Sequence, residues 1–336
     1  MKESGPHRAN TAIGKKTPVA SRILCIVDFQ NPNHTALQRA AWLAGCTGAR
    51  VELLSVHYND YLVGHPLFDA KLLEQARDKA IESDRAKLEK LAEPLRKGGL
   101  EVGTVAVWDH PLHEGIVRRA CASGADLVMK DMQYHAGFDA ASLAHTDWNL
   151  VRTCPMPLWL VKPEELPAQP RVIAAIDPMH GHDKPAALDD AILRLSKSIA
   201  RDVDGEVHAF HSFDPRIIAS MATLNVYVAE TMRPEEIAVE FEEQHRRRFD
   251  EVVGFHGIDA AHAHLAKGCV HRELPKLARE LDAGVVVMGA INRDWLKRLF
   301  IGSTAERTLD KLPCDLVIVK PDWFKTPVRM RVEAGA

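Results

Sequence analysis

A basic segment with two glycines near the carboxyl end of the chain carries residue types that bind phosphate. Gly289 directly follows the apolar run 285–288, and Gly302 with Ser303 comes thirteen residues later. Glycine lets a backbone approach a ligand closely, and the free N–H groups at a helix start attract anions. Between the glycines stand three cations: Arg293, Lys297 and Arg298. The pattern predicts a phosphate cradle built from a strand end, a basic loop and a helix N-terminus.

The same residues also have simpler structural interpretations. Gly289 could be a tight strand exit, and Ser303 with Glu306 has the spacing of a helix capping box, which needs no ligand. Asp177 ends an apolar run and could be a turn former. No GxSxG, HExxH or Walker lysine pattern occurs. The residues therefore predict binding, and they identify no catalytic group.

An internal repeat supplies the elements that must position this segment. Two pairs of similar segments share one offset of 158 residues, and a third pair has an offset of 149: Ala125–Met129 with Ala283–Val287, Pro157–Pro163 with Asp315–Pro321, and Arg22–Asp28 with Arg171–Asp177. In each copy, Val/Ile/Leu-rich strands alternate with amphipathic helices, which is typical of a parallel sheet covered on both faces. Such sheets bind ligands at the carboxyl ends of their strands.

The repeat divides the chain into two tandem doubly wound α/β domains. Residues 21–164 and 171–325 form the two domains, and the proline-rich segment 164–170 links them. We expect a disordered N-terminal tail over 1–20 and a C-terminal tail over 326–336. We expect each domain to have its own sheet.

The spacing Gly-x2-Gly-x9-Gly-Ser/Thr between the last two strands resembles the nucleotide-binding motif of the universal stress protein family. Gly289, Gly302 and Ser303 match it, whereas Asn292 stands at the second glycine. Asparagine tolerates left-handed backbone geometry better than most residues. Asp177 matches the aspartate that ends the first strand and lies near the nucleotide in binding members of that family.

The resemblance covers residues 20–325. The tandem arrangement is similar to that of the E-type universal stress proteins, and the segments that support this similarity are 146–148 in the first copy and 314–322 at the end of the second. It implies a five-stranded parallel sheet in each domain, dimer-like packing of the domains and ATP binding by copies that carry the motif. We therefore expect ATP, with or without Mg²⁺, at Asp177, Gly289, Asn292, Arg293, Gly302, Ser303 and Thr304. The nucleotide would be a regulatory ligand of a cytoplasmic stress-response or signalling protein. A scaffold that binds no nucleotide and a slow ATPase are the alternatives.

The first copy lacks this motif. At the offset of 158, the four motif positions become Asp131, Tyr134, Ala144 and His145. Residues 131–150 contain three aspartates and no lysine or arginine, and carboxylates repel phosphate. We expect no nucleotide binding of the same kind here; the loop either takes a different ligand or is closed by Tyr134, Phe138 and Trp148.

Histidines form a second candidate cluster. His262 and His264 share a face if their segment is a strand, and His208 and His211 lie on the preceding strand. Imidazole is a zinc ligand, but solvated or core histidines are the simpler interpretation, and we predict no metal site.

Charge and composition exclude several classes of protein. The net charge of −3 gives no field for nucleic acid or anionic membranes, and no apolar run is long enough to span a bilayer. Six scattered cysteines without CxxC spacing indicate a reducing cytoplasm. The last strand of each copy, 158–161 and 316–319, is a candidate exposed edge, and we expect a homodimer.

Overall fold

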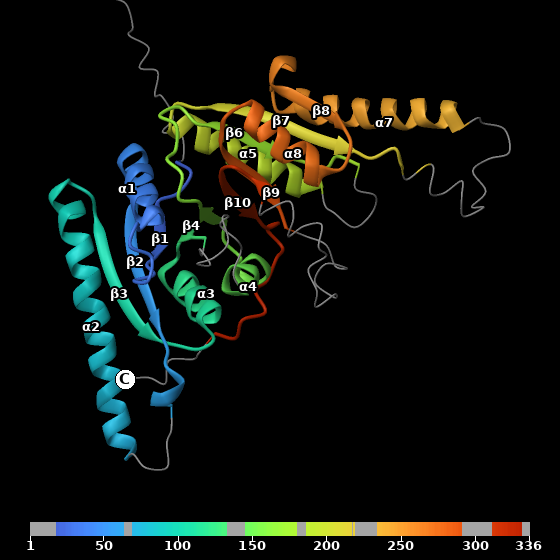
Figure 1. Ribbon diagram of the computed structural model, residues 1–336. Coiled ribbons are helices and arrows are strands. Elements are labelled where there is room, and N and C mark those ends of the chain that lie inside the picture. Colours follow the sequence, from blue (N-terminus) through green and yellow to red (C-terminus); the bar gives the residue numbers. More distant parts are fainter. Residues whose placement is uncertain are drawn as a thin grey trace, which may run out of the picture.

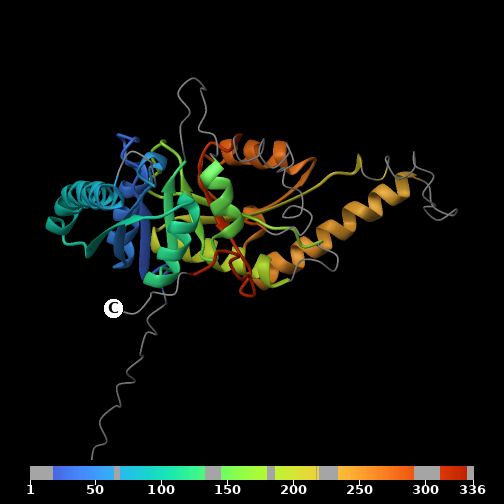
Figure 2. The same cartoon turned by 90° about the horizontal axis from the view of Figure 1, so that it is seen from below.

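The computed structural model describes residues 18–63, 69–132, 145–179, 186–216, 218, 234–290 and 311–330. Within these residues, ten strands form one twisted sheet with helices on both faces (Figure 1). The long helices α2 and α7 lie at opposite ends of the molecule (Figure 2).

The first half contains five of the strands. Its elements are β1 (Arg22–Ile26), α1 (Thr35–Thr47), β2 (Arg50–His57), the short 3₁₀ helix η1 (Asp60–Leu62), α2 (Ala70–Lys97), β3 (Val102–Trp108), α3 (Leu112–Ser123), β4 (Leu127–Asp131), α4 (His145–Thr153) and β5 (Leu158–Val161). The second half contains β6 (Arg171–Ala175), α5 (Ala186–Asp202), β7 (Glu206–Phe213), α7 (Pro234–Phe255), η2 (Ala260–His262), β8 (Ala263–Lys267), α8 (Val270–Glu280), β9 (Ala283–Gly289) and β10 (Asp315–Val319).

Both halves have the same strand order, as the repeat predicts. The order is β3-β2-β1-β4-β5 in one half and β8-β7-β6-β9-β10 in the other, with parallel pairing throughout each half. The register supports the offset of 158 residues, because Asp131 lies opposite Val161 and Gly289 lies opposite Val319. The predicted doubly wound α/β fold, with five parallel strands in each copy, is confirmed.

The expectation of two separate sheets is wrong. β5 and β10, predicted as exposed edges, pair with each other in antiparallel orientation and are buried along their whole length. Trp159 lies opposite Val317 at the centre of a local pseudo-twofold axis. Unpaired strand edges invite association with other chains, and this pairing closes both edges within one chain. Exposed edges of β5 and β10 therefore no longer support a homodimer. The homodimer stays a prediction.

A buried carboxylate fixes this junction. Asp315, at the start of β10, accepts hydrogen bonds from Arg39 Nε at 2.8 Å, from the Trp159 indole at 2.9 Å and from the Lys162 backbone N–H at 2.9 Å. Asp315 is 2% exposed and Arg39 is 8% exposed. The three donors lie on α1, on β5 and directly after β5. One side chain of the second half thus joins three parts of the first half.

The expected tails are partly ordered. The backbone N–H of Val19 donates to Asp202 at 2.6 Å, and Ala20 is a core residue. At the other end, Val328 is buried, and Arg118 of α3 donates to the carbonyl of Arg329 at 3.0 Å. The packed body therefore includes 18–20 and 326–330; residues 1–17 and 331–336 lie outside the described part of the chain.

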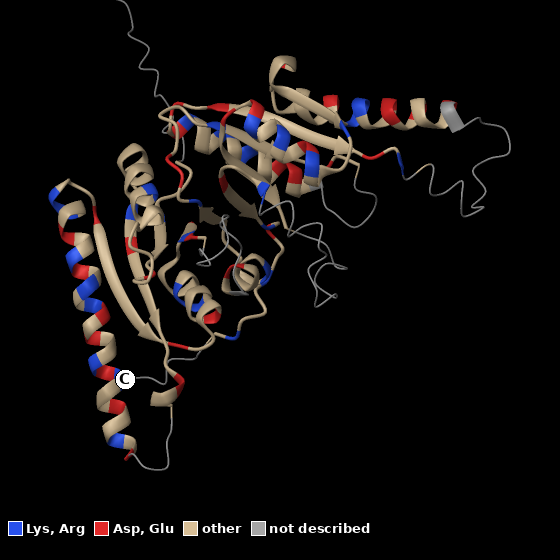
Figure 3. Cartoon of the chain, viewed as in Figure 1, with Lys and Arg blue, Asp and Glu red and all other residues tan. Residues whose placement is uncertain are grey.

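The strands are mostly apolar, and most charged residues lie on the helices (Figure 3). Acidic and basic side chains alternate along α2 and α7, and pairs such as Arg247 with Glu240 at 3.0 Å lie on the outer face. These are solvated ion pairs of small energetic value. Of the helices that are described, none combines the length and the apolar character needed to cross a membrane.

The buried carboxylate gives a stability prediction. In Asp315→Asn the guanidinium of Arg39 stays buried without its counter-charge, so the free energy of unfolding should fall by about 3–5 kcal/mol in urea titrations. Glu101→Gln is the matched control, because it removes a carboxylate that pairs with Arg50 at 3.3 Å and is 71% exposed. The control should change the free energy by less than about 0.5 kcal/mol. Equal losses in the two variants would contradict a special role for Asp315.

Candidate functional site

A pocket of about 830 Å³ opens at the carboxyl ends of β6, β7 and β9 in the second half. From β6 the chain adds β7 and β8 on one side, and it then crosses over to add β9 and β10 on the other side, so the strand order reverses at β6. This is the switch point at which doubly wound sheets place their ligands. The pocket therefore occupies the position that the strand order favours.

Two of the seven predicted site residues line this pocket. Asp177 follows β6 and Gly289 ends β9, and the fold brings them together. Asp177 is exposed, and its backbone N–H donates to Asp189 of α5 at 3.2 Å. The other five lie outside the described residues: Asn292, Arg293, Gly302, Ser303 and Thr304.

The packing of α5 alone accounts for a glycine at position 289. A Cβ atom there would lie 2.4 Å from Leu188 Cδ2 and 3.3 Å from Ile192 Cδ1. The side chains of Leu188 and Ile192 are fully buried, so they have little room to move. Gly289 is thus required where α5 packs against β9, and by itself it does not indicate a ligand.

An aromatic cluster that the sequence analysis missed forms one wall of the pocket. Phe213 ends β7 and stacks on His245 of α7 with ring centroids 4.9 Å apart, and Phe241 meets the same imidazole edge-on at 4.5 Å. All three line the pocket. Such a wall suits a flat heterocycle, because aromatic faces bind one another in stacked or edge-on geometry.

Two hydrogen-bonded histidines add a polar group to this wall. His211 Nδ1 lies 3.2 Å from the carbonyl of Ile176, and its Nε2 lies 2.8 Å from Nδ1 of His245. Because a carbonyl only accepts, Nδ1 of His211 must carry a proton, and its Nε2 then accepts from His245. Burial lowers the pKa of His245, while Asp177 opposes that shift. Neutral His245 therefore keeps Nε2 as a hydrogen-bond acceptor.

Charged residues line the mouth of the pocket. Arg216 donates to Asp214 from Nε at 2.9 Å and from its terminal nitrogen at 2.6 Å, and the thiol of Cys269 donates to the same carboxylate at 2.8 Å. The Arg216 hydrogen bonds hold the pKa of Asp214 well below its usual range. Arg216 is 70% exposed, so its side chain can exchange this partner for an anionic ligand.

Part of this wall was readable from the sequence. Asp214 directly follows β7, Asp177 lies two residues after β6, and polar residues at strand ends are a recognisable signal. Phe241 and His245 lie on α7, on the far side of the segment 217–233 in sequence. Their place depends on how α7 is rotated against the sheet, which hydrophobic periodicity does not specify.

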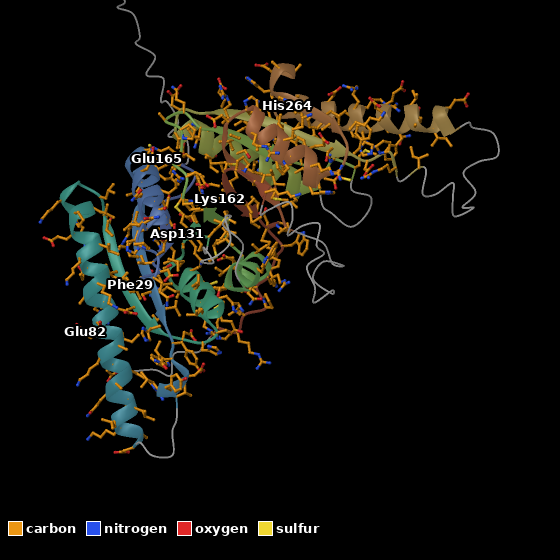
Figure 4. The ribbon with its side chains drawn as sticks, in the orientation of Figure 1. Phe29, Glu82, Asp131, Lys162, Glu165 and His264 are labelled. Atoms are coloured by element: carbon orange, nitrogen blue, oxygen red, sulfur yellow. The ribbon has the colours of Figure 1, made fainter. Side chains whose placement is uncertain are left out.

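The corresponding border of the first half has different chemistry. Asp131 stands at the position of Gly289, is buried, and accepts the backbone N–H of Ala36 in the first turn of α1 at 2.7 Å. Burial raises its pKa, and the Ala36 hydrogen bond opposes that rise. A protein carboxylate therefore already occupies donors that could bind an anion. Figure 4 labels Asp131 in the first half.

The expected repulsion from three free aspartates in the first half needs a correction. Asp147 is fully buried and pairs at 2.8 Å with Lys130, which directly precedes the segment 131–150. Asp147 therefore adds no free charge. Trp148 is a buried core residue, whereas Asp139, Tyr134 and Phe138 lie outside the described ranges.

Sequence comparison identifies the relatives of the chain. The profile of the universal stress protein family matches residues 20–162 and 170–320, one match in each half. Universal stress protein E of Escherichia coli K12 is 26% identical over 321 residues, which cover 92% of this chain and 96% of that protein. A universal stress protein E homolog of Haemophilus influenzae is 23% identical, with 89% and 97% covered.

Solved structures share the fold. A protein of unknown function from Pseudomonas aeruginosa superposes with a TM-score of 0.68 at 24% identity, covering 90% of this chain and 93% of that one. A universal stress protein from Archaeoglobus fulgidus gives a TM-score of 0.59 at 16% identity, covering 89% and 98%. With both halves matched by the family profile, the chain belongs to the universal stress protein family as a tandem, two-domain member of the E type.

Proposed function

We propose that the second half binds ATP, with Mg²⁺, as a regulatory ligand of a cytoplasmic stress-response protein. The observation that carries the proposal is the pocket at the carboxyl ends of β6, β7 and β9, in which Asp177 and Gly289 converge beside an aromatic wall. Its partners would be an adenine nucleotide and a protein that responds to the bound state, with no nucleic acid or membrane contact. The bound nucleotide would act by favouring one conformation.

The pocket chemistry supports an adenine nucleotide. A volume of about 830 Å³ falls within the range of roughly 300–1,000 Å³ usual for small-molecule sites. Phe213 and Phe241 offer faces and edges for a purine, and Nε2 of His245 can accept from a base amine or a ribose hydroxyl. Arg293, Gly302, Ser303 and Thr304 would hold the phosphates through side chains and the helix start.

The scaffold and the slow ATPase stay open as alternatives. Replacement of the second motif glycine by Asn292 favours the scaffold. Hydrolysis needs carboxylates that hold a metal and a positioned water, and Asp177 is an acid that lines the described pocket. Calorimetric titration with ATP and Mg²⁺ separates binding from the scaffold. Sustained phosphate release that Gly302→Val abolishes would favour the ATPase.

The motif makes a graded prediction for the full chain. Gly302→Val should block close approach to the phosphates and weaken ATP binding by at least tenfold in calorimetry. Ser303→Ala keeps the backbone N–H and should weaken binding less, because only one hydrogen bond is lost, worth on the order of 1.5–3 kcal/mol. His145→Ala, at the position of Ser303 in the first half, should leave the affinity unchanged.

The full chain is required for this experiment, because separate halves would expose the paired strands β5 and β10. If His145→Ala removes binding and Gly302→Val does not, the nucleotide belongs to the first half and the assignment is wrong. If the parent chain binds no nucleotide, the scaffold alternative replaces it.

The aromatic wall makes a second, independent prediction. Phe241→Ala should weaken ATP binding by about 5- to 150-fold, because base stacking contributes about 1–3 kcal/mol. Tyr58→Ala is the matched control: Tyr58 directly follows β2, as Asp214 follows β7, and stacks on His110 at 4.0 Å. Unchanged affinity in Phe241→Ala, with unfolding like that of the parent chain, would show that the base does not contact this wall.

A further inference from the structure

We propose that Glu206, His208 and His262 form a Zn²⁺ site at the amino end of β7, distinct from the nucleotide pocket. Each residue offers one ligand atom, and the three atoms all lie within 4.8 Å of one another. Two imidazoles and a carboxylate are a usual zinc donor set, and three protein ligands leave a fourth position for water. This proposal does not depend on nucleotide binding, because the pocket lies at the carboxyl end of the same strand.

His208 is the residue that most clearly needs a ligand. It is 4% exposed, and its Nε2 atom is buried with no hydrogen-bond partner among the residues that the structure describes. Buried polar atoms are nearly always hydrogen-bonded, so an exception calls for an explanation. A metal ion beside Nε2 would satisfy its lone pair.

The other nitrogen of His208 is held by a second histidine. Nδ1 lies 3.0 Å from Nε2 of His264, which Figure 4 labels on β8 of the second half. When Nδ1 carries the proton and donates to His264, Nε2 of a neutral His208 is the free acceptor. Histidine ligands of metals usually donate their second N–H to a partner in this way, which fixes the tautomer and the ring.

The strands bring the other two ligands to the same face. Glu206 and His208 are two residues apart on β7 and therefore point to one side. Ala209 pairs with Ala263, so His262 lies beside His208 where β8 begins, and the two rings are 4.7 Å apart. Glu206 Oε2 lies 3.8 Å from His208 Nε2, and its side chain is 59% exposed and able to turn.

The separations are compatible with zinc after small side-chain movements. An ion at the centre of a triangle with sides of 4.8 Å is about 2.8 Å from each corner, and zinc bonds to nitrogen and oxygen are about 2.0–2.2 Å long. The ligands would therefore move inward by less than about 1 Å.

The repeat shows what occupies the same place in the first half. Leu24 pairs with Glu52 as Ile173 pairs with His208, so Glu52 is the equivalent of His208. Glu52 forms a two-point ion pair with Arg119 of α3, at 2.7 and 2.6 Å. At the offset of 158 residues, Arg119 becomes Leu277 of α8. The second half thus lacks the cation that α3 supplies, and Zn²⁺ would take its place.

One positive and one negative side chain lie near the proposed zinc site. Arg171 Nε lies 3.5 Å from Glu206 Oε2, and the same guanidinium donates to the carbonyl of Leu281 at 2.6 Å. Glu206 can keep one oxygen on Arg171 and turn the other towards the metal. Glu280 lies close enough to influence His264 and adds negative charge. Bound zinc would join β7 to the outer strand β8 and the turn before it.

The test is zinc titration of the full chain without an affinity tag, after removal of metals, against a chromophoric chelator. One equivalent should bind, and bound zinc should raise the thermal unfolding midpoint. Glu206→Gln and His262→Gln should each lower the affinity at least tenfold and abolish the rise in the midpoint. His264→Gln should lower the affinity about 10- to 100-fold, because it removes the partner that orients His208.

The matched control variants carry Glu→Gln and His→Gln substitutions at exposed positions of the first half. Glu101→Gln and His110→Gln should bind zinc like the parent chain. Glu206→Gln is conservative and exposed, so it should unfold like the parent chain without zinc. The proposal is overturned if the parent chain binds no zinc at micromolar concentration. It is also overturned if Glu206→Gln and His262→Gln bind zinc as tightly as the two control variants.

Discussion

The antiparallel pairing of β5 with β10 joins the two halves of the chain into one sheet. Each half would otherwise end in an open strand edge, and the antiparallel pairing turns two five-stranded sheets into one. Asp315 fixes the junction by collecting three donors from the first half and its exit. A buried carboxylate with a buried guanidinium tolerates few other arrangements, because loss of either partner leaves a charge without compensation.

The antiparallel junction also sets where ligands can bind. Because β5 and β10 are antiparallel, the strands of the first half run opposite to the strands of the second half. The carboxyl ends of the two sets of strands therefore lie at opposite borders of the sheet. The proposed nucleotide pocket and the carboxyl ends of the first half therefore face different borders. The proposed zinc site lies at the amino end of β7. Two ligands can thus act on the second half without competing for one surface.

Chemistry has diverged between equivalent positions of the repeat. Asp131 closes the position that Gly289 leaves without a side chain, and Glu52 with Arg119 fills the place that His208 occupies in the second half. The strand order is the same in both copies, and these differences lie in the side chains at equivalent strand positions. This asymmetry is the basis for placing both proposed ligands in the second half.

The sequence predicted the features that depend on local pattern and on the repeat. The alternation of strands and helices and the equivalence of Asp131 with Gly289 came from apolar runs and a fixed offset. The pairing of β5 with β10 was not predicted, because a strand at the edge of a sheet and a strand at its centre can have the same apolar composition. The ion pair of Lys130 with Asp147 and the contact of Phe241 with His245 depend on how distant helices pack, which no local pattern encodes.

A nucleotide bound in the second half alone should protect only the strand ends of that half from hydrogen exchange. Hydrogen exchange of the full chain, measured by mass spectrometry with and without ATP and Mg²⁺, tests it most directly. We expect slower exchange where β6, β7 and β9 end, at 176–178, 213–216 and 288–290, and unchanged exchange at 27–29, 57–59 and 131–132 in the first half. Slower exchange confined to the first-half segments would contradict the account.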